Sequence, residues 1–537
     1  MILFHYCNHL ESQRTNDISA ESMKRFRLTK GAKVLIFVLI IAIIVGGVFM
    51  GLKTGLVNND LKPDADGNVI NTEKKSSETI NLSLDEWIGW KSIIDANGGL
   101  STKKGSIYDD MGINVNISII NDATQSSNAL ISGQIDAAGY TINRTAFLSK
   151  KFKDAGIDVV MPFITNFSNG GDGIIANSNI KTVADLKSAK IGVPQFSEAH
   201  SLVVWFVNQS DISDNDKEQI INNLVFFATP DEAAKAFFSG HVDVAATWEP
   251  YLTQAKNMSD AHILFSTASS SSLIMDGILF NAEFASKNSE VVSKFIDGAL
   301  QASDLYSTDL DTIKSVMPMF ATASDRDIKD NCVSAKLTTY ADNINLFNGT
   351  ARTIYSDMCA VWNSIGEAVD KDLVNTLYDG SYIKTLAGKY DANKTTTVDN
   401  IPSVTDENKD EILETSALLQ KSATVNFVIN TAKFSDSIEA TKALDEFISI
   451  AKVLDGTIIE IAGNTDPNPT TDPEDTANKM LSQQRAETVK QYFILNGIPA
   501  NRIIAVGNGS SNPIVANDTE EHRAMNRRTD VSFKIVE

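Results

Sequence analysis

Cysteine and histidine are scarce in this chain, and each scarcity excludes a class of protein. Three cysteines among 537 residues cannot form a disulfide scaffold or a four-cysteine zinc or iron–sulfur site. The six histidines are scattered and form no H-E-x-x-H motif, so we expect no metal site and no cofactor. The G-x-S-x-G and GxxxxGK[ST] motifs are also missing, and the sequence gives no support for an enzyme.

Positive charge is also in short supply. The chain has 47 Lys and Arg residues against 68 Asp and Glu residues, a net charge of -21. This balance is unlike that of a general nucleic-acid binder, so no nucleic-acid partner is expected. The 43% content of hydrophobic residues excludes a disordered chain, and the length indicates about three domains.

One long uncharged stretch stands near the N-terminus. Residues 34–52 (VLIFVLIIAIIVGGVFMGL) are long enough, as a helix, to cross a bilayer. Five basic residues precede the stretch and only Lys53 follows closely, which predicts a cytoplasmic tail (1–33) and export of everything after residue 52. A cleaved signal peptide would have a shorter apolar core and a small-x-small cleavage site after Gly51. We therefore predict a single-pass anchor in the cell membrane.

Cys332 and Cys359 both fall on the exported side of this anchor. They are consistent with a disulfide and equally with two buried free thiols, because free cysteine packs as a small hydrophobic residue.

The exported part begins with a polar linker (53–78) and continues as a domain over 79–390. Apolar runs of strand length alternate there with helical stretches, which predicts an α/β domain with parallel sheets covered by helices on both faces. Sheets of this kind bind ligands beyond the carboxyl ends of their strands. The expected strands are 115–120, 135–140, 159–164, 173–177, 190–194, 242–248 and 277–281.

Two segments of this domain share one plan. Residues 123–141 and 228–248 each begin with Ala-Thr, continue as a helix to Ser-Gly, and end in a strand that contains Asp-x-Ala. The glycines, Gly133 and Gly240, suit a left-handed helix cap. Any α/β protein repeats such units by chance, but the number of matching positions favours duplication. We therefore expect two similar lobes, the second at about 166–268, whose strand ends face each other across a cleft.

A set of motifs in this order resembles the type 2 periplasmic solute-binding proteins, in the branch of the nitrate, sulfonate, taurine and thiamine-precursor receptors. The resemblance covers residues 79–390 and implies a two-lobed fold that closes around a small-molecule solute and delivers it to an ABC permease. The same branch contains a pyrimidine-forming enzyme, which is an analogy of fold only. The motifs are DEWIGWKSIIDANGGL, GGDGI, TVADLKSAKIGVP, SEAHSL, TWEPYL and LIMDGILF.

Eight residues at strand ends and helix starts are the candidate ligand-binding set. A tryptophan ring can form the wall of a pocket that binds a flat or cationic group. Two acidic members hint at an amine or amidine on the ligand, whereas a helix N-terminus at Ser197 hints at an acidic group. A zwitterionic or heteroaromatic solute fits both. The alternatives are core tryptophans, a surface histidine at 200 and a helix-capping role for Glu249. The set is Trp87, Trp90, Thr141, Ser197, His200, Trp248, Glu249 and Asp276.

A second polar linker (391–424) precedes a C-terminal domain at 425–537. Strand patterns at 458–463, 502–506 and 531–535 flank an amphipathic helix at 476–497, which predicts an α+β sandwich. The alternation of Val531, Phe533 and Ile535 with polar residues indicates a sheet with one wet face.

This domain resembles the OmpA-like family, which binds peptidoglycan. A carboxylate at a strand end and an arginine on the following helix can clamp a zwitterion. The resemblance implies that Asp466 binds the ammonium and Arg485 the carboxylate of diaminopimelate in the stem peptide, with Asn478 and Arg527 in support. The alternative is a salt bridge that ties helix to sheet. Asn464 departs from the family, which usually has histidine, and the loop at 467–477 is longer than usual. The matching residues are Gly463, Thr465, Asp466, Asn478, Leu481, Ser482, Arg485, Ala486, Asn526, Arg527 and Arg528.

Together these features predict a membrane-anchored extracytoplasmic receptor of an ABC-type uptake system, tethered to peptidoglycan by its C-terminal domain. The alternative is a structural membrane-to-wall tether, or a sensor, without a role in transport. A flagellar-type stator also joins one membrane helix to an OmpA-like domain, but it needs an ionisable residue within that helix, and residues 34–52 have none.

Overall fold

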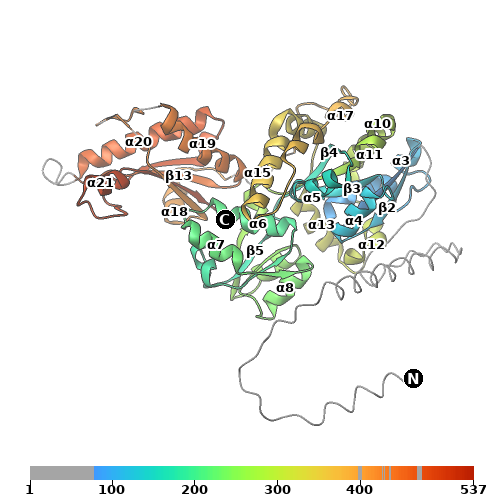
Figure 1. Cartoon of the computed structure of the whole chain (residues 1–537), viewed down its shortest axis with the longest axis horizontal. Coiled ribbons are helices and arrows are strands. Elements are labelled where there is room, and N and C mark those ends of the chain that lie inside the picture. The colour runs from blue at the N-terminus through green and yellow to red at the C-terminus, as the bar shows by residue number, and fades with distance from the viewer. Residues whose placement is uncertain are drawn as a thin grey trace, which may run out of the picture. The chain divides into compact units, whose positions relative to one another are not determined.

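The computed structural model describes residues 78–396 and 402–536, except 426, 429, 435, 436 and 468–474. The predicted tail, the predicted anchor at 34–52 and the first linker up to residue 77 lie outside the described residues. Among the helices that the structure does describe, none is both long and apolar enough to cross a membrane. The described chain forms three sheets, each with its own helices (Figure 1).

The first sheet has the strand order β11-β4-β10-β3-β1-β2. Strand β1 pairs in parallel with β2 and β3, whereas β10 runs antiparallel to β3 and β4. Nearly every residue of these strands is buried, because helices cover both faces, as expected for an α/β sheet. The strands are β1 (Thr79–Leu84), β2 (Asn114–Ile119), β3 (Ala137–Thr141), β4 (Val159–Ser168), β10 (Met275–Asn281) and β11 (Ala335–Leu337).

The second sheet has the order β7-β6-β8-β5-β9. Strand β6 is parallel to β7 and β8, and β5 is antiparallel to β8 and β9. The sequence pattern predicted parallel sheets, but both sheets are mixed, because β5 and β10 follow short crossing segments instead of crossover helices. The strands are β5 (Asp172–Asn177), β6 (Ile191–Pro194), β7 (Leu224–Phe227), β8 (Val244–Trp248) and β9 (Ala261–Ser266).

The chain therefore passes between the two sheets twice, from β4 to β5 and from β9 to β10, and the sheets define two lobes. In the first lobe, the helices that precede β11 are α2 (Lys91–Asn97), α3 (Ile107–Asp110), α4 (Ala123–Ile131), α5 (Ile142–Ala155), α10 (Ala282–Lys287), α11 (Ser289–Gln301), α12 (Asp311–Val316) and α13 (Asp325–Ser334). The second lobe contains α6 (Glu198–Gln209), α7 (Asp214–Asn222), α8 (Pro230–Phe238) and α9 (Tyr251–Lys256). After β11 come α14 (Tyr340–Asn345), α15 (Ala351–Ser364), α16 (Val374–Leu377) and α17 (Ser381–Lys384).

The shared plan of 123–141 and 228–248 corresponds to one α–β unit in each lobe. Helices α4 and α8 end at Ser132 and Ser239, and the following Gly133 and Gly240 have φ values of 70° and 74°. Strands β3 and β8 follow. Each lies beside the strand by which the chain enters that sheet from the other lobe, which is β10 for β3 and β5 for β8. The expectation of one α–β unit per lobe, with its left-handed glycine, is confirmed.

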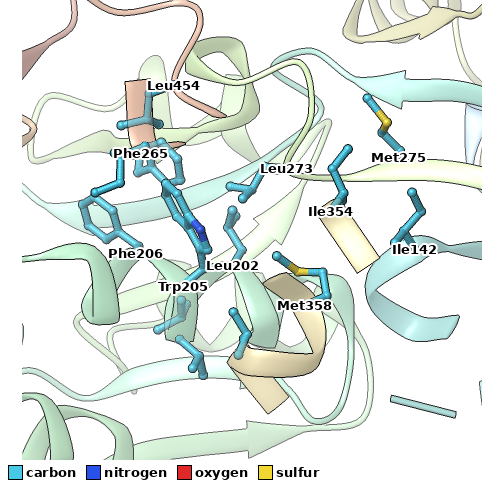
Figure 2. Close-up of a cluster of buried hydrophobic side chains, with 14 of the residues drawn as sticks. Ile142, Leu202, Trp205, Phe206, Phe265, Leu273, Met275, Ile354, Met358 and Leu454 are labelled. Atoms are coloured by element: carbon cyan, nitrogen blue, oxygen red, sulfur yellow. The ribbon is translucent and has the colours of Figure 1, made fainter. Parts of the chain in front are cut away.

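The hydrophobic core of the second lobe continues to the junction between the lobes (Figure 2). Trp205 and Phe206 of α6 stack against Phe265 of β9, with ring centroids 6.0 and 4.8 Å apart. The same cluster includes Ile354 and Met358 of α15, a helix that packs against both α5 and α6. Both lobes therefore pack against one continuous hydrophobic core at their junction.

The third sheet, in the C-terminal part, has the order β12-β15-β13-β14, with β13 parallel to β14 and antiparallel to β15. Ala486, Val489 and Phe493 of α20 are fully buried against it, as its amphipathic pattern predicted. The second predicted linker ends in α18 and β12, so its last residues belong to this sheet. The elements are α18 (Lys409–Glu414), β12 (Leu419–Ala423), α19 (Ser437–Val453), β13 (Ile458–Gly463), α20 (Thr476–Leu495), β14 (Ile503–Gly507), α21 (Glu520–Asn526) and β15 (Thr529–Lys534).

Candidate functional site

Charged side chains from both lobes meet where strand ends of the two sheets face each other. Asp85 follows β1, and Asp276 of β10 lies opposite Thr141 at the end of β3. Thr141 caps α5 by accepting a hydrogen bond from the backbone of Arg144. This cap fixes the first turn of α5, from which the guanidinium extends toward the second lobe.

The second lobe contributes three side chains to the same place. Asp172 begins β5 and pairs in register with Trp248, the last residue of β8, while Glu198 is the first residue of α6. Arg144 Nη2 lies 2.8 Å from Glu198 Oε2, and Arg144 Nη1 lies 3.7 Å from Asp85 Oδ2. We call Asp85, Arg144, Asp172, Glu198 and Asp276 the interlobe cluster.

Aromatic rings border the interlobe cluster. The indoles of Trp87 and Trp248 stack across the lobes, with centroids 6.4 Å apart. Trp87 Nε1 donates to Asn166 Oδ1 (3.0 Å), and Trp90 Nε1 donates to Asp85 Oδ1 (2.7 Å). A Cβ atom on Gly171 would lie 2.5 Å from the Trp87 ring, so only glycine at this position allows the ring to approach.

Burial and neighbouring charges disfavour ionisation of Asp85, Asp172 and Asp276. Burial, followed by the charges of Asp85 and the other carboxylates, raises the pKa of Asp276 well above its usual range. Burial and the Glu198 carboxylate raise the pKa of Asp172 to about 7. Burial also raises the pKa of Asp85. Burial lowers the pKa of Arg144, but the Glu198 and Asp85 carboxylates outweigh this effect and raise it.

Three polar atoms of this region are buried without a hydrogen-bond partner within the part of the chain that the structure describes: Asp276 Oδ2, Arg144 Nε and Trp248 Nε1. Buried polar groups in native proteins are almost always hydrogen-bonded, so orphaned atoms at one place point to a missing partner. They are one carboxyl oxygen and two N–H donors, and the residues that carry them come from both lobes. A small polar molecule held between the lobes would satisfy them.

The structure brings together five of the eight predicted ligand-binding residues: Trp87, Trp90, Thr141, Trp248 and Asp276. The other three have local partners. Ser197 caps α6, accepting from the backbone N–H of His200. Glu249 accepts hydrogen bonds from the backbone N–H and the hydroxyl of Thr253 in α9, which corresponds to the helix-capping alternative for this residue.

His200 lies in an aromatic environment instead of the interlobe cluster. Its Nδ1 accepts from the backbone N–H of Phe196, and its ring contacts Phe226 and Trp362. Burial lowers its pKa to about 4, so the ring is neutral at pH 7. The expected anion site at the start of α6 also has an acidic neighbour, because Glu198 occupies the first turn.

Four members of the interlobe cluster were missed by sequence reasoning. Asp85, Asp172 and Glu198 each lie inside a motif that carries the family resemblance, so the motifs contained a usable signal. Arg144 stands three residues after Thr141, and only the helix start at that point brings its side chain to the cleft.

A second candidate site is a cavity of about 710 Å³ in the C-terminal domain. All four predicted peptidoglycan-binding residues line it, between the end of β13 and helices α20 and α21. A Cβ atom on Gly463 would lie 2.3 Å from the backbone oxygen of Ser482, so glycine lets α20 approach the strand end. The cavity is lined by Asp466, Asn478, Arg485, Arg527, Glu520, Arg523, Arg528, Thr465, Phe427 and neighbouring residues.

Within this cavity Asp466 pairs with Arg527 (3.3 Å), which also pairs with Glu520 (2.7 Å). Asn478 Nδ2 donates to the backbone oxygen of Asp466 (3.2 Å). Arg485 forms no ion pair with any described carboxylate. Its Nε donates to the Thr431 backbone oxygen, and its guanidinium lies 4.9 Å from the centre of the Phe427 ring.

Burial and the charge of Arg527 lower the pKa of Arg485, so its surroundings favour an anion beside it. Thr465 Oγ1 is buried without a partner among the described residues. Asn464, where the family usually has histidine, donates to Asp530 (2.9 Å) and accepts from Asn508 (3.0 Å) beneath the cavity. Most of the longer loop at 467–477 lies outside the described residues.

Comparisons with known proteins match both parts of the chain. Residues 101–309 match the NMT1/THI5 like family model, and residues 426–527 match the OmpA family model. The chain therefore joins an NMT1/THI5-like domain to a C-terminal OmpA-family domain.

Over 82 residues the chain is 35% identical to a putative aliphatic sulfonates-binding protein of Escherichia coli, covering 15% of this chain and 24% of that protein. Over 54 residues it is 46% identical to the peptidoglycan-binding protein ArfA of Mycobacterium bovis, covering 10% of this chain and 17% of that protein. The chain spans less than half the length of the curated relatives it matches. The solved structure of the periplasmic aliphatic sulphonate binding protein SsuA from Escherichia coli matches with a TM-score of 0.46 and 17% identity, covering 57% of this chain and 99% of that one.

Proposed function

We propose that this protein is an extracytoplasmic solute-binding receptor of an ABC-type uptake system, anchored in the cell membrane by residues 34–52 and tethered to peptidoglycan by its C-terminal domain. The observation that carries the proposal is the set of buried, unpartnered polar atoms from both lobes at one place: Asp276 Oδ2, Arg144 Nε and Trp248 Nε1. A site that is complete only with a small molecule between the lobes is what a solute receptor requires.

Solute capture would involve closure of the lobes about the two crossing segments. These segments are linked to each other at the junction: the Ser168 and Thr267 hydroxyls lie 2.8 Å apart, and Gly170 N–H donates to Thr267 Oγ1 (2.9 Å). The links hold the segments together while the lobes rotate. On this proposal, opening of the lobes would break the Arg144–Glu198 pair and the Trp87–Trp248 stack.

The C-terminal cavity supports the tether. Diaminopimelate presents an ammonium and a carboxylate on one carbon, and the cavity offers Asp466 to the first and Arg485 to the second. Both ends of the Asp466–Arg527 pair are partly exposed, at 27% and 33%, so Asp466 can accept a further donor. A receptor held between membrane and wall stays near its permease at a high effective concentration.

The test is a thermal-shift screen of the full chain in detergent against sulfonates, amino acids, nitrate, phosphate, polyamines and pyrimidines. A solute at 100 times its Kd adds ~2.7 kcal/mol to the free energy of unfolding, a clear shift. Trp248→Ala should abolish that shift, whereas Trp205→Phe in the second-lobe core should leave it in place. Absence of a shift with every solute would reject the receptor proposal and favour the structural tether.

A further inference from the structure

The interlobe cluster contains more carboxyl groups than cationic groups. It brings four carboxyl groups, those of Asp85, Asp172, Glu198 and Asp276, around a single guanidinium. Arg144 is already engaged by Glu198 and Asp85, so its charge is shared between two carboxylates. Neither Asp172 nor Asp276 forms an ion pair with a described Lys, Arg or His residue.

Among the members of the cluster, Asp276 gives the strongest evidence about the charge of the solute. Its side chain is 3% exposed, and Oδ2 has no hydrogen-bond partner among the described residues. It interacts electrostatically with all four other members of the interlobe cluster. An unpartnered carboxyl oxygen at such a site calls for a hydrogen-bond partner, and a cationic donor would also favour ionisation of the neighbouring carboxyl groups.

We propose that the solute is an organic cation whose ammonium or amidinium group binds Asp276 and Asp172 beside the indoles of Trp87 and Trp248. The inference rests on the proposed receptor function and adds the charge of the solute. The indole faces suit a cation, and exclusion of water by the buried rings strengthens its attraction to the carboxylates. The unpartnered donors Arg144 Nε and Trp248 Nε1 call for a hydrogen-bond acceptor on the same solute.

Two other occupants fit less well. An anion would add to the negative charge of the cluster, and the only guanidinium there is already paired. A bare metal ion needs a set of ligands at coordination distance, and within the described ranges no three His, Cys, Asp or Glu residues are arranged to hold one. An organic cation needs only hydrogen-bonding carboxylates and an aromatic wall, and both are present.

The experiment compares solutes that differ only in charge. The full chain in detergent is titrated with the cation benzamidine, its uncharged counterpart benzamide and the anion benzenesulfonate. Putrescine is titrated as a further cationic solute. We expect binding by cationic members alone, weakened about tenfold or more in Asp276→Asn and Asp172→Asn, because each variant removes a charge-assisted hydrogen bond.

The matched control is Glu283→Gln on α10, an exposed carboxylate of the same lobe, which should bind as the parent does. Thermal unfolding of each variant checks that it is folded, and either cluster variant alone suffices if the other is not. Stronger binding of the anionic or uncharged counterparts would overturn the inference and leave the receptor proposal intact. Cation binding that both cluster variants retain would also overturn it. Failure of every member to bind, whatever its charge, would count against the receptor proposal itself, and the inference would fall with it.

Discussion

Arg144 of the first lobe and Glu198 of the second form an ion pair 2.8 Å long, with side chains only 13% and 8% exposed. The pair joins the lobes at the place where the unpartnered polar atoms gather. It therefore connects lobe closure to the electrostatics of the candidate solute site.

Breaking this pair should favour separation of the lobes. Arg144→Met leaves Glu198 unpaired, and an uncompensated buried charge costs about 3–5 kcal/mol while the lobes stay closed. Opening returns Glu198 to water and avoids that cost. We expect a larger radius of gyration for the ligand-free variant, measured by small-angle X-ray scattering. Lys150→Met, which breaks an exposed pair on the same helix, is the control and should not change it.

Stability should fall as pH rises through the range in which Asp172 titrates. The pKa of Asp172 is about 7 in the folded protein because of burial and Glu198, and about 3.9 in the unfolded chain. Between these values the folded protein binds a proton that the unfolded chain has released, so folding loses stability as pH increases from about 4 to about 7. Glu198, Asp85 and Asp276 interact electrostatically with this carboxyl group and change its charge environment.

The measurement is the melting temperature of the ligand-free full chain from pH 5 to pH 8. We expect the parent to lose stability over this range and Asp172→Asn to lose less. Equal slopes for both proteins would mean that this carboxyl group ionises normally. A cationic solute would bind more tightly as pH rises, because it favours the ionised carboxylates.

Gly171→Ala should disturb the aromatic border of the cleft. The added Cβ would lie 2.5 Å from the Trp87 ring, and overpacking of this kind costs about 1–3 kcal/mol. Trp87→Phe shortens the ring and should relieve the clash, so the double variant should lose less stability than the sum of the single variants. Chemical denaturation measures this coupling, and strict additivity would show that the ring and the glycine do not interact.

Wall binding should depend on Arg485 and Asp466. Arg485→Ala removes the guanidinium without a described carboxylate partner, and Asp466→Ala removes the carboxylate that would bind the ammonium. Each should reduce retention of the full chain on purified sacculi by about tenfold or more, the loss of a charge-assisted pair. Lys452→Ala, at the end of α19 and outside the cavity, is the control. Retention by both cavity variants at the parental level would show that these two side chains do not bind the wall.

Cys332 and Cys359 should be unreactive in the folded protein. The structure leaves both as free, buried thiols, and this decides between the alternatives that the sequence left open. Burial raises the pKa of Cys332 to about 12 and that of Cys359 to about 11, so neither forms the reactive thiolate at neutral pH. Titration with a thiol reagent should modify these two positions only after unfolding, as mapped by mass spectrometry. A disulfide-linked peptide from the native protein would contradict the prediction.

Local patterns predicted the elements well where the signal is periodic. The two α–β units with Gly133 and Gly240, the strands at 190–194 and 277–281, and the helix that carries Arg485 all follow from hydrophobic spacing and caps. The direction of β5 and β10 did not follow, because strand polarity depends on how the chain crosses between lobes.

The candidate solute site was likewise predicted only in part from the sequence. Trp87, Trp248 and Asp276 were identified from their places at strand ends, whereas Glu249 and His200 were assigned to the cleft by position alone. Their side chains satisfy local needs, a helix cap and an aromatic core, that compete with a ligand. Arg144 and Glu198 are 54 positions apart in the chain, and nothing in their local sequence reports that they meet.

The sequence by itself determined the charge balance, the α/β and α+β classes of the two domains, the α–β unit that recurs in the first domain, and four residues that line the C-terminal cavity. These follow from composition, periodicity and ordered motifs, which are local properties of the chain. Only the tertiary structure decided which carboxylates share the cleft, that Arg144 is paired across the lobes, and that Asp276 is buried without a partner. Burial and pairing depend on distances between residues far apart in sequence, and those distances exist only once both lobes have folded and closed.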